Sequence, residues 1–148
     1  MTAEELDALV ENVRAKEAWQ FDGQRDTPLT AATIRAIEEA EQIQLPSSFK
    51  EFLARYGAGD FVFSQVYSPD RNSGWNLWDQ FQYMPDKKGL LIPFSDNGAG
   101  DYYCFPVVSG VCEDRVVWAD HEQNYSITES QYRDFREFVA DVCLRINE

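Results

Sequence analysis

Basic residues are scarce in this sequence of 148 residues. Thirteen lysines and arginines face 26 aspartates and glutamates, which gives a formal net charge of −13. Nucleic-acid binding depends on positive charge that displaces the counterions of the phosphate backbone, and an anionic membrane surface also attracts basic segments. Direct nucleic-acid binding is therefore all but excluded and membrane binding is disfavoured, whereas a basic protein partner suits this charge.

The histidines and paired cysteines of a zinc site are also lacking, and so is an export signal. The chain has one histidine, and no two of its three cysteines, Cys104, Cys112 and Cys143, have the CxxC spacing of a zinc site. Acids occupy the N-terminal residues where a signal peptide needs a basic stretch and an apolar run, and no segment approaches the length of a membrane span. We expect reduced structural thiols, a cytoplasmic location, no metal and no cofactor.

Repeats and low-complexity tracts are absent, and the chain length is typical of one domain. A hydrophobic fraction of 44% is sufficient for a buried core. We therefore predict a single domain over residues 1–148. Its core covers about residues 30–142, and an N-terminal helix over residues 2–19 is an addition to that core.

Helical periodicity is clear at both ends of the chain. Thr2 and Glu5 have the spacing of a capping box, in which each side chain satisfies a free backbone N–H, and Ser48 and Glu51 repeat that spacing. Apolar residues recur at helical intervals after each of these pairs and again near the C-terminal end. The expected helices cover residues 2–19, 30–42, 47–56 and 130–146.

The pattern changes between the last two predicted helices. Short segments rich in β-branched and aromatic residues alternate there with turns that contain glycine and aspartate. The order of helices, then strands, then a helix predicts an α+β fold: residues 60–127 form a single mixed, largely antiparallel sheet with helices packed mainly on one face. The expected strands cover residues 61–67, 89–94, 101–107 and 115–118.

The loop from Ser95 to Asp101 is the first candidate site. Its glycines allow a tight turn that projects Asp96 and Asp101 from the same rim. The loop lacks the lysine of a phosphate-binding loop and the spacing of an EF-hand. A hairpin turn in which the Asx side chains cap backbone groups is the simpler interpretation, and metal binding is the alternative.

The segment 118–122 is the second candidate site, because it holds the only histidine, His121, between two carboxylates. In a catalytic interpretation, one of these carboxylates orients His121 as a general base. However, the chain has no nucleophile motif, and adjacent side chains on an extended chain point to opposite sides. We therefore expect no enzymatic activity, and no convergence of Asp96, Asp101 and His121 into a metal site.

Four pieces of the sequence, in order, resemble the signature of the SUKH superfamily. Residues 45–57 resemble its Leu-Pro-x-x-aromatic-x-x-Phe-Leu motif, and residues 116–122 resemble its Trp-Asp-His-Glu segment. The glycine-rich turn ending in Asp101 and the closing helix over 130–139 complete the order. The resemblance implies an α+β fold and a function by protein binding without catalysis, as in the immunity proteins of bacterial polymorphic toxin systems and in eukaryotic relatives that regulate cell-wall synthesis.

The resemblance and the net charge together lead to one hypothesis. The chain is a non-enzymatic immunity protein that neutralises a cognate toxin, often a nuclease, by presenting carboxylates where phosphates would sit and aromatic side chains that desolvate the contact. The alternative is a regulatory or scaffold module without a toxin partner. We expect the acids of the site to be solvated in the free protein. The predicted partner-binding residues are Asp96, Asp101, Tyr102, Trp118, Asp120, Glu122 and Trp75.

Overall fold

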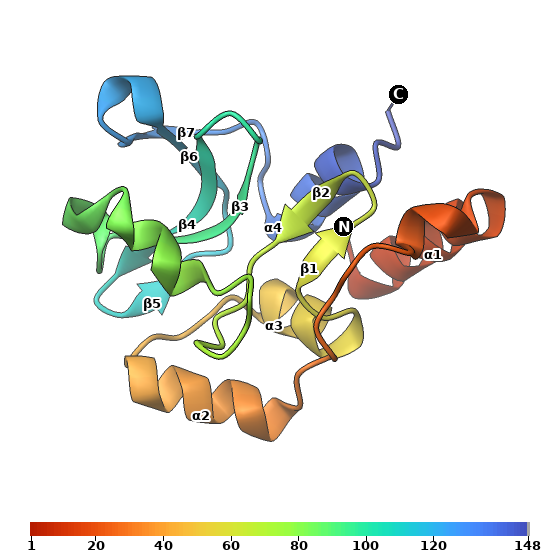
Figure 1. Ribbon diagram of the computed structural model, residues 1–148, viewed down its shortest axis with the longest axis horizontal. Coiled ribbons are helices and arrows are strands. Elements are labelled where there is room, and N and C mark those ends of the chain that lie inside the picture. Colours follow the sequence, from red (N-terminus) through yellow and green to blue (C-terminus); the bar gives the residue numbers. More distant parts are fainter. Residues whose placement is uncertain (148) are drawn as a thin grey trace.

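The larger sheet of the computed structural model, which describes residues 1–147, is antiparallel and lies on the left in Figure 1, whereas α1 lies at the far right. In this part of the chain the sheet has five strands in the order β3-β4-β6-β7, with β5 paired to β4. A separate two-stranded sheet contains β1 and β2. The strands are β1 (Gly59–Phe61), β2 (Ser64–Val66), β3 (Leu91–Asp96), β4 (Tyr102–Val108), β5 (Val111–Cys112), β6 (Val117–Asp120) and β7 (Ser126–Glu129). The predicted α+β class is confirmed.

Helices precede and follow the strands, as the sequence pattern predicts. Among residues 1–147, no helix combines the length and the apolar character needed to cross a membrane. The α-helices are α1 (Ala3–Lys16), α2 (Ala31–Glu41), α3 (Ser47–Arg55) and α4 (Phe135–Phe138), and α4 continues into the π-helical turn η5 (Val139–Cys143). Short 3-10 helices are η1 (Ala18–Phe21), η2 (Leu77–Gln82), η3 (Pro85–Lys87) and η4 (His121–Gln123).

Phenylalanine side chains join α3 and α4 to one face of the five-stranded sheet. Phe49 of α3 and Phe135 of α4 are in edge contact, with ring centroids 5.3 Å apart. Phe94 of β3 stacks on Phe105 of β4 at 4.4 Å and meets Phe138 of α4 at 4.9 Å. All five rings are fully buried. Because buried aromatic rings dominate core energetics, this cluster fixes the two helices on the sheet.

The opposite face of the sheet is covered by η2. Side chains alternate along a strand, so Tyr102 and Tyr103 of β4 point to opposite faces. The Tyr103 ring packs on Phe138 at 4.6 Å, whereas the Tyr102 hydroxyl donates to Gln80 of η2 at 3.0 Å. The α-helices α3 and α4 therefore lie on one side, and a turn-rich segment lies on the other.

That segment contradicts one prediction. Residues 60–127 form two sheets and not one, because residues 67–90 contain η2 and η3 in place of a strand meander. The reason is local: these residues alternate apolar anchors such as Leu77 and Phe81 with turn formers, so no period-two strand pattern is sustained. The ladders of both sheets are antiparallel, and parallel pairing is limited to isolated bridges within the described residues.

The last helix also begins later than residue 130. Ser130 instead prolongs the pairing of β7 with β6, because its N–H and its hydroxyl both donate to the carbonyl of Val116, at 3.2 and 2.7 Å. The helix starts at Phe135, after Asp134, whose carboxylate accepts from the N–H of Glu137 at 2.8 Å. A side-chain cap of this kind satisfies an N–H that the helix leaves free, and so it sets the starting residue.

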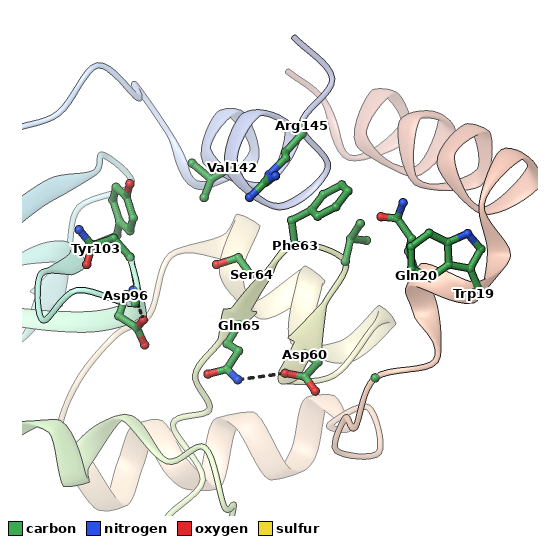
Figure 2. Close-up of a pocket in the computed structure, with 14 residues that line it drawn as sticks. Trp19, Gln20, Asp60, Phe63, Ser64, Gln65, Asp96, Tyr103, Val142 and Arg145 are labelled. Atoms are coloured by element: carbon green, nitrogen blue, oxygen red, sulfur yellow. Dashed lines mark hydrogen bonds between the residues drawn. The ribbon is translucent and has the colours of Figure 1, made fainter. Parts of the chain in front are cut away.

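The β1–β2 hairpin stands beside the main sheet (Figure 2). Its strands pair Asp60 with Gln65, and the Gln65 amide donates to the Asp60 carboxylate at 3.0 Å. The turn between the strands contains Val62 and Phe63, and the N–H of Phe63 donates to the carbonyl of Cys143 in η5 at 3.1 Å. The hairpin is therefore attached to the C-terminal helix by its turn.

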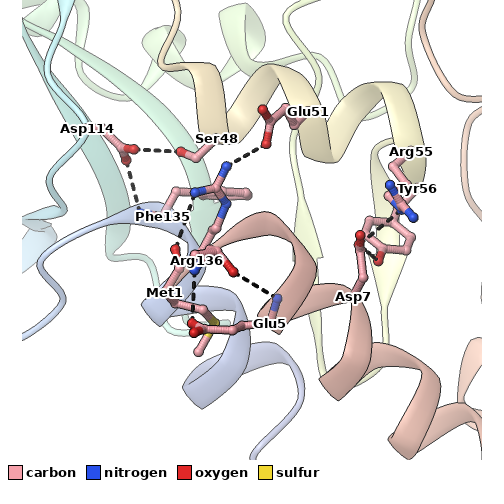
Figure 3. Close-up of polar contacts among 11 residues, drawn as sticks. Met1, Glu5, Asp7, Ser48, Glu51, Arg55, Tyr56, Asp114, Phe135 and Arg136 are labelled. Carbon is pink, nitrogen blue, oxygen red and sulfur yellow. Dashed lines mark hydrogen bonds and ion pairs between the residues drawn. The ribbon is translucent and has the colours of Figure 1, made fainter.

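Polar contacts attach α1 to α3 and to α4 (Figure 3). Asp7 of α1 forms an ion pair with Arg55 at 3.0 Å and accepts from the hydroxyl of Tyr56. Arg136 of α4 pairs with Glu51 of α3 at 2.5 Å and also donates to the carbonyl of Met1. The predicted capping box of Thr2 and Glu5 at the start of α1 is confirmed.

Asp114 joins the beginnings of α3 and α4 (Figure 3). The expected capping box of Ser48 and Glu51 is wrong, because α3 is capped by Pro46 with no side-chain bond. Ser48 is buried, and its hydroxyl donates to Asp114 at 2.8 Å. The other oxygen of Asp114 accepts from the N–H of Phe135 at 3.1 Å. One carboxylate from the β5–β6 connection thus serves both helices.

We expect Asp114→Ala to lower the free energy of unfolding by about 1–2 kcal/mol, because it removes a helix-start acceptor and leaves a buried hydroxyl without its partner. Urea denaturation measures the difference. The control is Glu113→Ala in the neighbouring position, whose carboxylate pairs with Arg115 at the surface and is expected to change stability by less than about 1 kcal/mol. Equal effects of the two substitutions contradict the assigned role of Asp114.

Candidate binding surface at the acidic end of the sheet

The pairing of β4 with β6 brings the two candidate motifs together. Tyr102 lies opposite Ala119, and Tyr103 lies opposite Trp118. Asp101, just before β4, therefore lies beside the end of β6, and carboxylate and imidazole atoms of Asp101, Asp120 and His121 come within 4.8 Å of one another. We call this end of the sheet the acidic rim. It consists of Asp101, Trp118, Asp120, His121 and Glu122.

Asp101 is the central acceptor of the acidic rim. One of its oxygens accepts from the backbone N–H of His121 at 3.0 Å and contacts Nδ1 of the same ring at 2.5 Å. The other accepts from the amide of Asn97 at 3.0 Å. The side chain is only 13% exposed. The expectation of a solvated carboxylate is therefore wrong for Asp101, because its neighbours enclose it and use its lone pairs.

Of Asp96, Asp101 and His121, which we expected not to converge into a metal site, the structure brings only Asp101 and His121 together. The two residues pair across the β4–β6 register, which sequence neighbours alone do not reveal. The ring also packs against Gly100, whose φ is +103° and where an added Cβ would lie 3.2 Å from the imidazole. Asp96 stands outside this group: its carboxylate accepts from the hydroxyl of Tyr67 and from the N–H of Gly98.

The pairing of Asp101 with His121 changes the pKa of both side chains. Hydrogen bonding to Asp101 raises the pKa of His121 above its ordinary value of 6.5, against a smaller effect of desolvation, and the charges of Asp101, Glu122 and Asp120 add to the rise. Burial favours a higher pKa for Asp101, but the donors from His121 and Asn97 together bring that pKa below its ordinary value of 3.8. The folded state therefore favours a charged pair.

This pair predicts a pH-dependent contribution to stability. A raised histidine pKa stabilises the fold fully below about pH 6.5 and loses this effect as the pH rises through the folded-state value; a lowered aspartate pKa acts above about pH 4 and is lost as the pH falls through its folded-state value. The difference in melting temperature between the wild type and His121→Ala is expected to be largest near pH 5–6 and to shrink above pH 7. A difference that does not vary between pH 5 and pH 8 contradicts the pairing.

Asp101, Asp120 and His121 offer oxygen and nitrogen atoms of the type that bind divalent cations. Several of these atoms already take part in hydrogen bonds within the rim. Both oxygens of Asp101 accept hydrogen bonds, and one oxygen of Asp120 accepts from the N–H of Glu122 at 2.9 Å. These hydrogen bonds hold the loop before β4 and the end of β6 together.

The other predicted residues fall into two groups. Glu122 is exposed on η4, and Trp118 and Asp120 are half-buried on the same face of β6, where the Trp118 ring meets Tyr103 at 4.7 Å. These residues form the accessible part of the acidic rim. Tyr102 and Trp75 lie elsewhere: Tyr102 is only 6% exposed on the opposite face, and the ring of Trp75 lies close to Gly59 in β1.

Sequence reasoning missed two exposed aromatic residues. Trp19 in η1 is 68% exposed and Phe63 in the β1–β2 turn is 42% exposed. The available signal at Trp19 was its position three and four residues before the turn residues Asp22 and Gly23, where the apolar stripe of the first helix ends.

The geometry defines this chain as an α+β protein whose sheet carries acidic and aromatic side chains at one end. The chain belongs to the SUKH_6 family, described as SMI1-KNR4 cell-wall, whose model matches residues 31–139. A crystal structure of a protein from Pseudomonas syringae pv. tomato has the same fold: the TM-score is 0.61 with 21% identity, over 94% of this chain and 98% of that chain. No curated protein matches the sequence.

Proposed function

We propose that this protein is a non-enzymatic immunity protein that binds and neutralises a cognate toxin of a bacterial polymorphic toxin system, and that the acidic rim is its contact surface. The partner is a protein domain with a basic surface. In this function the carboxylates of the acidic rim take the place of the phosphates that a nuclease site would hold, and the ring of Trp118 excludes water from the contact.

The observation that carries this proposal is that two accessible acids of the rim, Asp120 and Glu122, lack a basic partner in the described part of the chain. Within residues 1–147, no basic side chain forms an ion pair with Asp120 or Glu122. These charges repel one another and the rest of a chain of net charge −13. A basic partner relieves this repulsion, and long-range attraction accelerates its association.

The cysteines support binding without catalysis. Cys104, Cys112 and Cys143 are free and buried, and burial raises the pKa of the Cys112 and Cys143 thiols to about 12. A thiol held in its protonated form is a poor nucleophile. Free buried thiols also agree with a reducing compartment, so we propose a cytoplasmic location.

The test uses the neighbouring gene, since toxins of this kind are encoded beside their immunity proteins. The C-terminal domain of a large neighbouring gene product is produced in a bacterial host with and without this chain. We expect growth arrest by the domain alone, normal growth with both, and a stable complex on size-exclusion chromatography. A toxic domain that is neither bound nor neutralised overturns the proposal.

The family description favours a second candidate function, because it refers to the cell wall. In that case the chain is a regulatory module whose partner is a resident cellular protein. Affinity purification from cells that lack any toxin gene then recovers the same partner under all growth conditions. Recovery of a toxin domain and no such partner rejects this second candidate.

A further inference from the structure

A cleft of about 750 Å³ lies beside the acidic rim and is distinct from it. It is bounded by η1, the β1–β2 hairpin, the loop after β3 and the end of η5 (Figure 2). Aromatic side chains stand on its walls, and the carboxylates of Asp60 and Asp96 line it. The proposed toxin contact at the acidic rim assigns no role to this cleft.

The walls of the cleft expose more aromatic surface than the fold requires. Trp19 is 68% exposed, and η1, the helix that contains it, has no fully buried residue. Phe63 is 42% exposed, and the guanidinium of Arg145 lies 4.3 Å above its ring. Tryptophan and other aromatic residues dominate the energetics of protein interfaces because they bury a large rigid area on binding.

A turn with a strained backbone presents Phe63 to the cleft. Val62 has a φ of +59°, a left-handed conformation that costs about 1–3 kcal/mol for such a residue and that a β-branched side chain adopts rarely. The strain persists because Val62 packs against the core and because the N–H of Phe63 donates to Cys143. A glycine at position 62 would form this turn without strain. The turn nevertheless keeps the conformation that presents the ring of Phe63 to the cleft.

Among residues 1–147, the cleft is lined by two carboxylates, those of Asp60 and Asp96, and by one cation, Arg145, which lies over the ring of Phe63. Acids are therefore in excess and favour a cationic occupant. Asp60 accepts from the N–H of Gln24 at 3.1 Å and from Gln65 at 3.0 Å, and Asp96 accepts from Tyr67 and Gly98. No ion pair neutralises Asp60 or Asp96 within the described residues. A carboxylate oxygen accepts more than one hydrogen bond, so both groups retain capacity for an added donor.

We infer that this cleft binds a basic segment of a partner protein. Two basic side chains of the segment place their charged heads at Asp60 and at Asp96, which lie apart in the cleft (Figure 2). The aromatic side chain that separates them in the segment lies between Trp19 and Phe63. This arrangement matches the division of an interface into a desolvated aromatic centre and charge pairs that fix the register. The inference does not depend on the acidic rim or on the identity of the partner.

The test is a titration of the full chain, labelled with ¹⁵N, with the peptide acetyl-Gly-Lys-Phe-Lys-Gly-amide. We expect saturable shifts of the amides of Ser64, Gln65 and Gly98, with a Kd of about 1 mM or lower. The matched probe acetyl-Gly-Glu-Phe-Glu-Gly-amide is expected to bind at least about tenfold more weakly because its charges are repelled. Equal binding of the two peptides, or shifts confined to the acidic rim, overturns the inference.

Variants locate the binding further. Trp19→Ala and the isosteric pair Asp60→Asn and Asp96→Asn are each expected to weaken the basic peptide about tenfold, with the spectrum otherwise unchanged. The controls are Tyr83→Ala, an aromatic residue that is 59% exposed elsewhere, and Glu39→Gln on α2, and both are expected to bind like the wild type. Concentration-dependent shifts of the same amides without peptide identify a second copy of the chain as the occupant and also overturn the inference.

The proposal that the cleft binds a basic segment and the proposal that the acidic rim binds a toxin can be rejected independently. Loss of peptide binding in the cleft variants with full neutralisation of a toxin supports the cleft and leaves the rim as the toxin contact. Normal peptide binding in every cleft variant rejects the cleft, whatever the toxin assay shows.

Discussion

Replacing Asp101 with lysine is expected to lower the free energy of unfolding by about 2–4 kcal/mol. The carboxylate is 13% exposed and accepts from two N–H groups of His121 and from Asn97. Lysine cannot accept these bonds. Its ammonium group would lie beside the imidazole and face the N–H groups that now donate to the carboxylate. The main effect of this substitution is therefore on folding, although Asp101 belongs to the acidic rim.

Chemical denaturation of three variants separates charge from hydrogen bonding. Asp101→Asn retains one acceptor oxygen and is expected to lose less stability than Asp101→Lys. Glu122→Lys makes the same charge change at an exposed position of the acidic rim and is expected to alter stability by less than about 0.5 kcal/mol. If Asp101→Lys unfolds at the same denaturant concentration as the wild type, the buried-acceptor role of Asp101 is wrong.

Local patterns in the sequence predicted the helical parts of this fold. The capping box at Thr2, the apolar stripe of α3 and the left-handed glycine after it, Gly57 with φ +78°, depend on residues within a few positions of one another. Short-range spacing fixes such features, so the order of the residues is enough to predict them. The same logic failed at Ser48, because a distant acceptor, Asp114, competes for its hydroxyl.

Long-range register was the part that the sequence could not supply. Asp101 and His121 are twenty residues apart, and they meet because β4 pairs with β6 in one particular register. A shift of one residue would have reversed every side chain on the strand, so the sequence suggested a rim of acids but not which of them is enclosed. Tyr102 shows the same limit: its place in the motif was clear, but its face was not, and that face is covered by η2.

Glu122→Lys is expected to weaken the binding of a basic toxin partner by about 2–5 kcal/mol if the carboxylate pairs with a cation that is buried in the complex. Glu122 is exposed on η4 beside Trp118 and Asp120, so it is the acid of the acidic rim best placed for direct contact. Its side chain forms no ion pair within residues 1–147, so reversing the charge breaks no salt bridge and removes only the effect of that charge on His121.

Binding kinetics at several salt concentrations measure this effect and identify its cause. Electrostatic steering by the acidic rim makes association with the wild type slow markedly as salt rises, and Glu122→Lys is expected to reduce both the association rate and its dependence on salt. Glu39→Lys makes the same charge change on α2, away from the acidic rim, so it isolates the effect of net charge alone. If both variants lose the same affinity while their melting temperatures stay equal, the net charge of the chain attracts the partner and the acidic rim is not the contact surface.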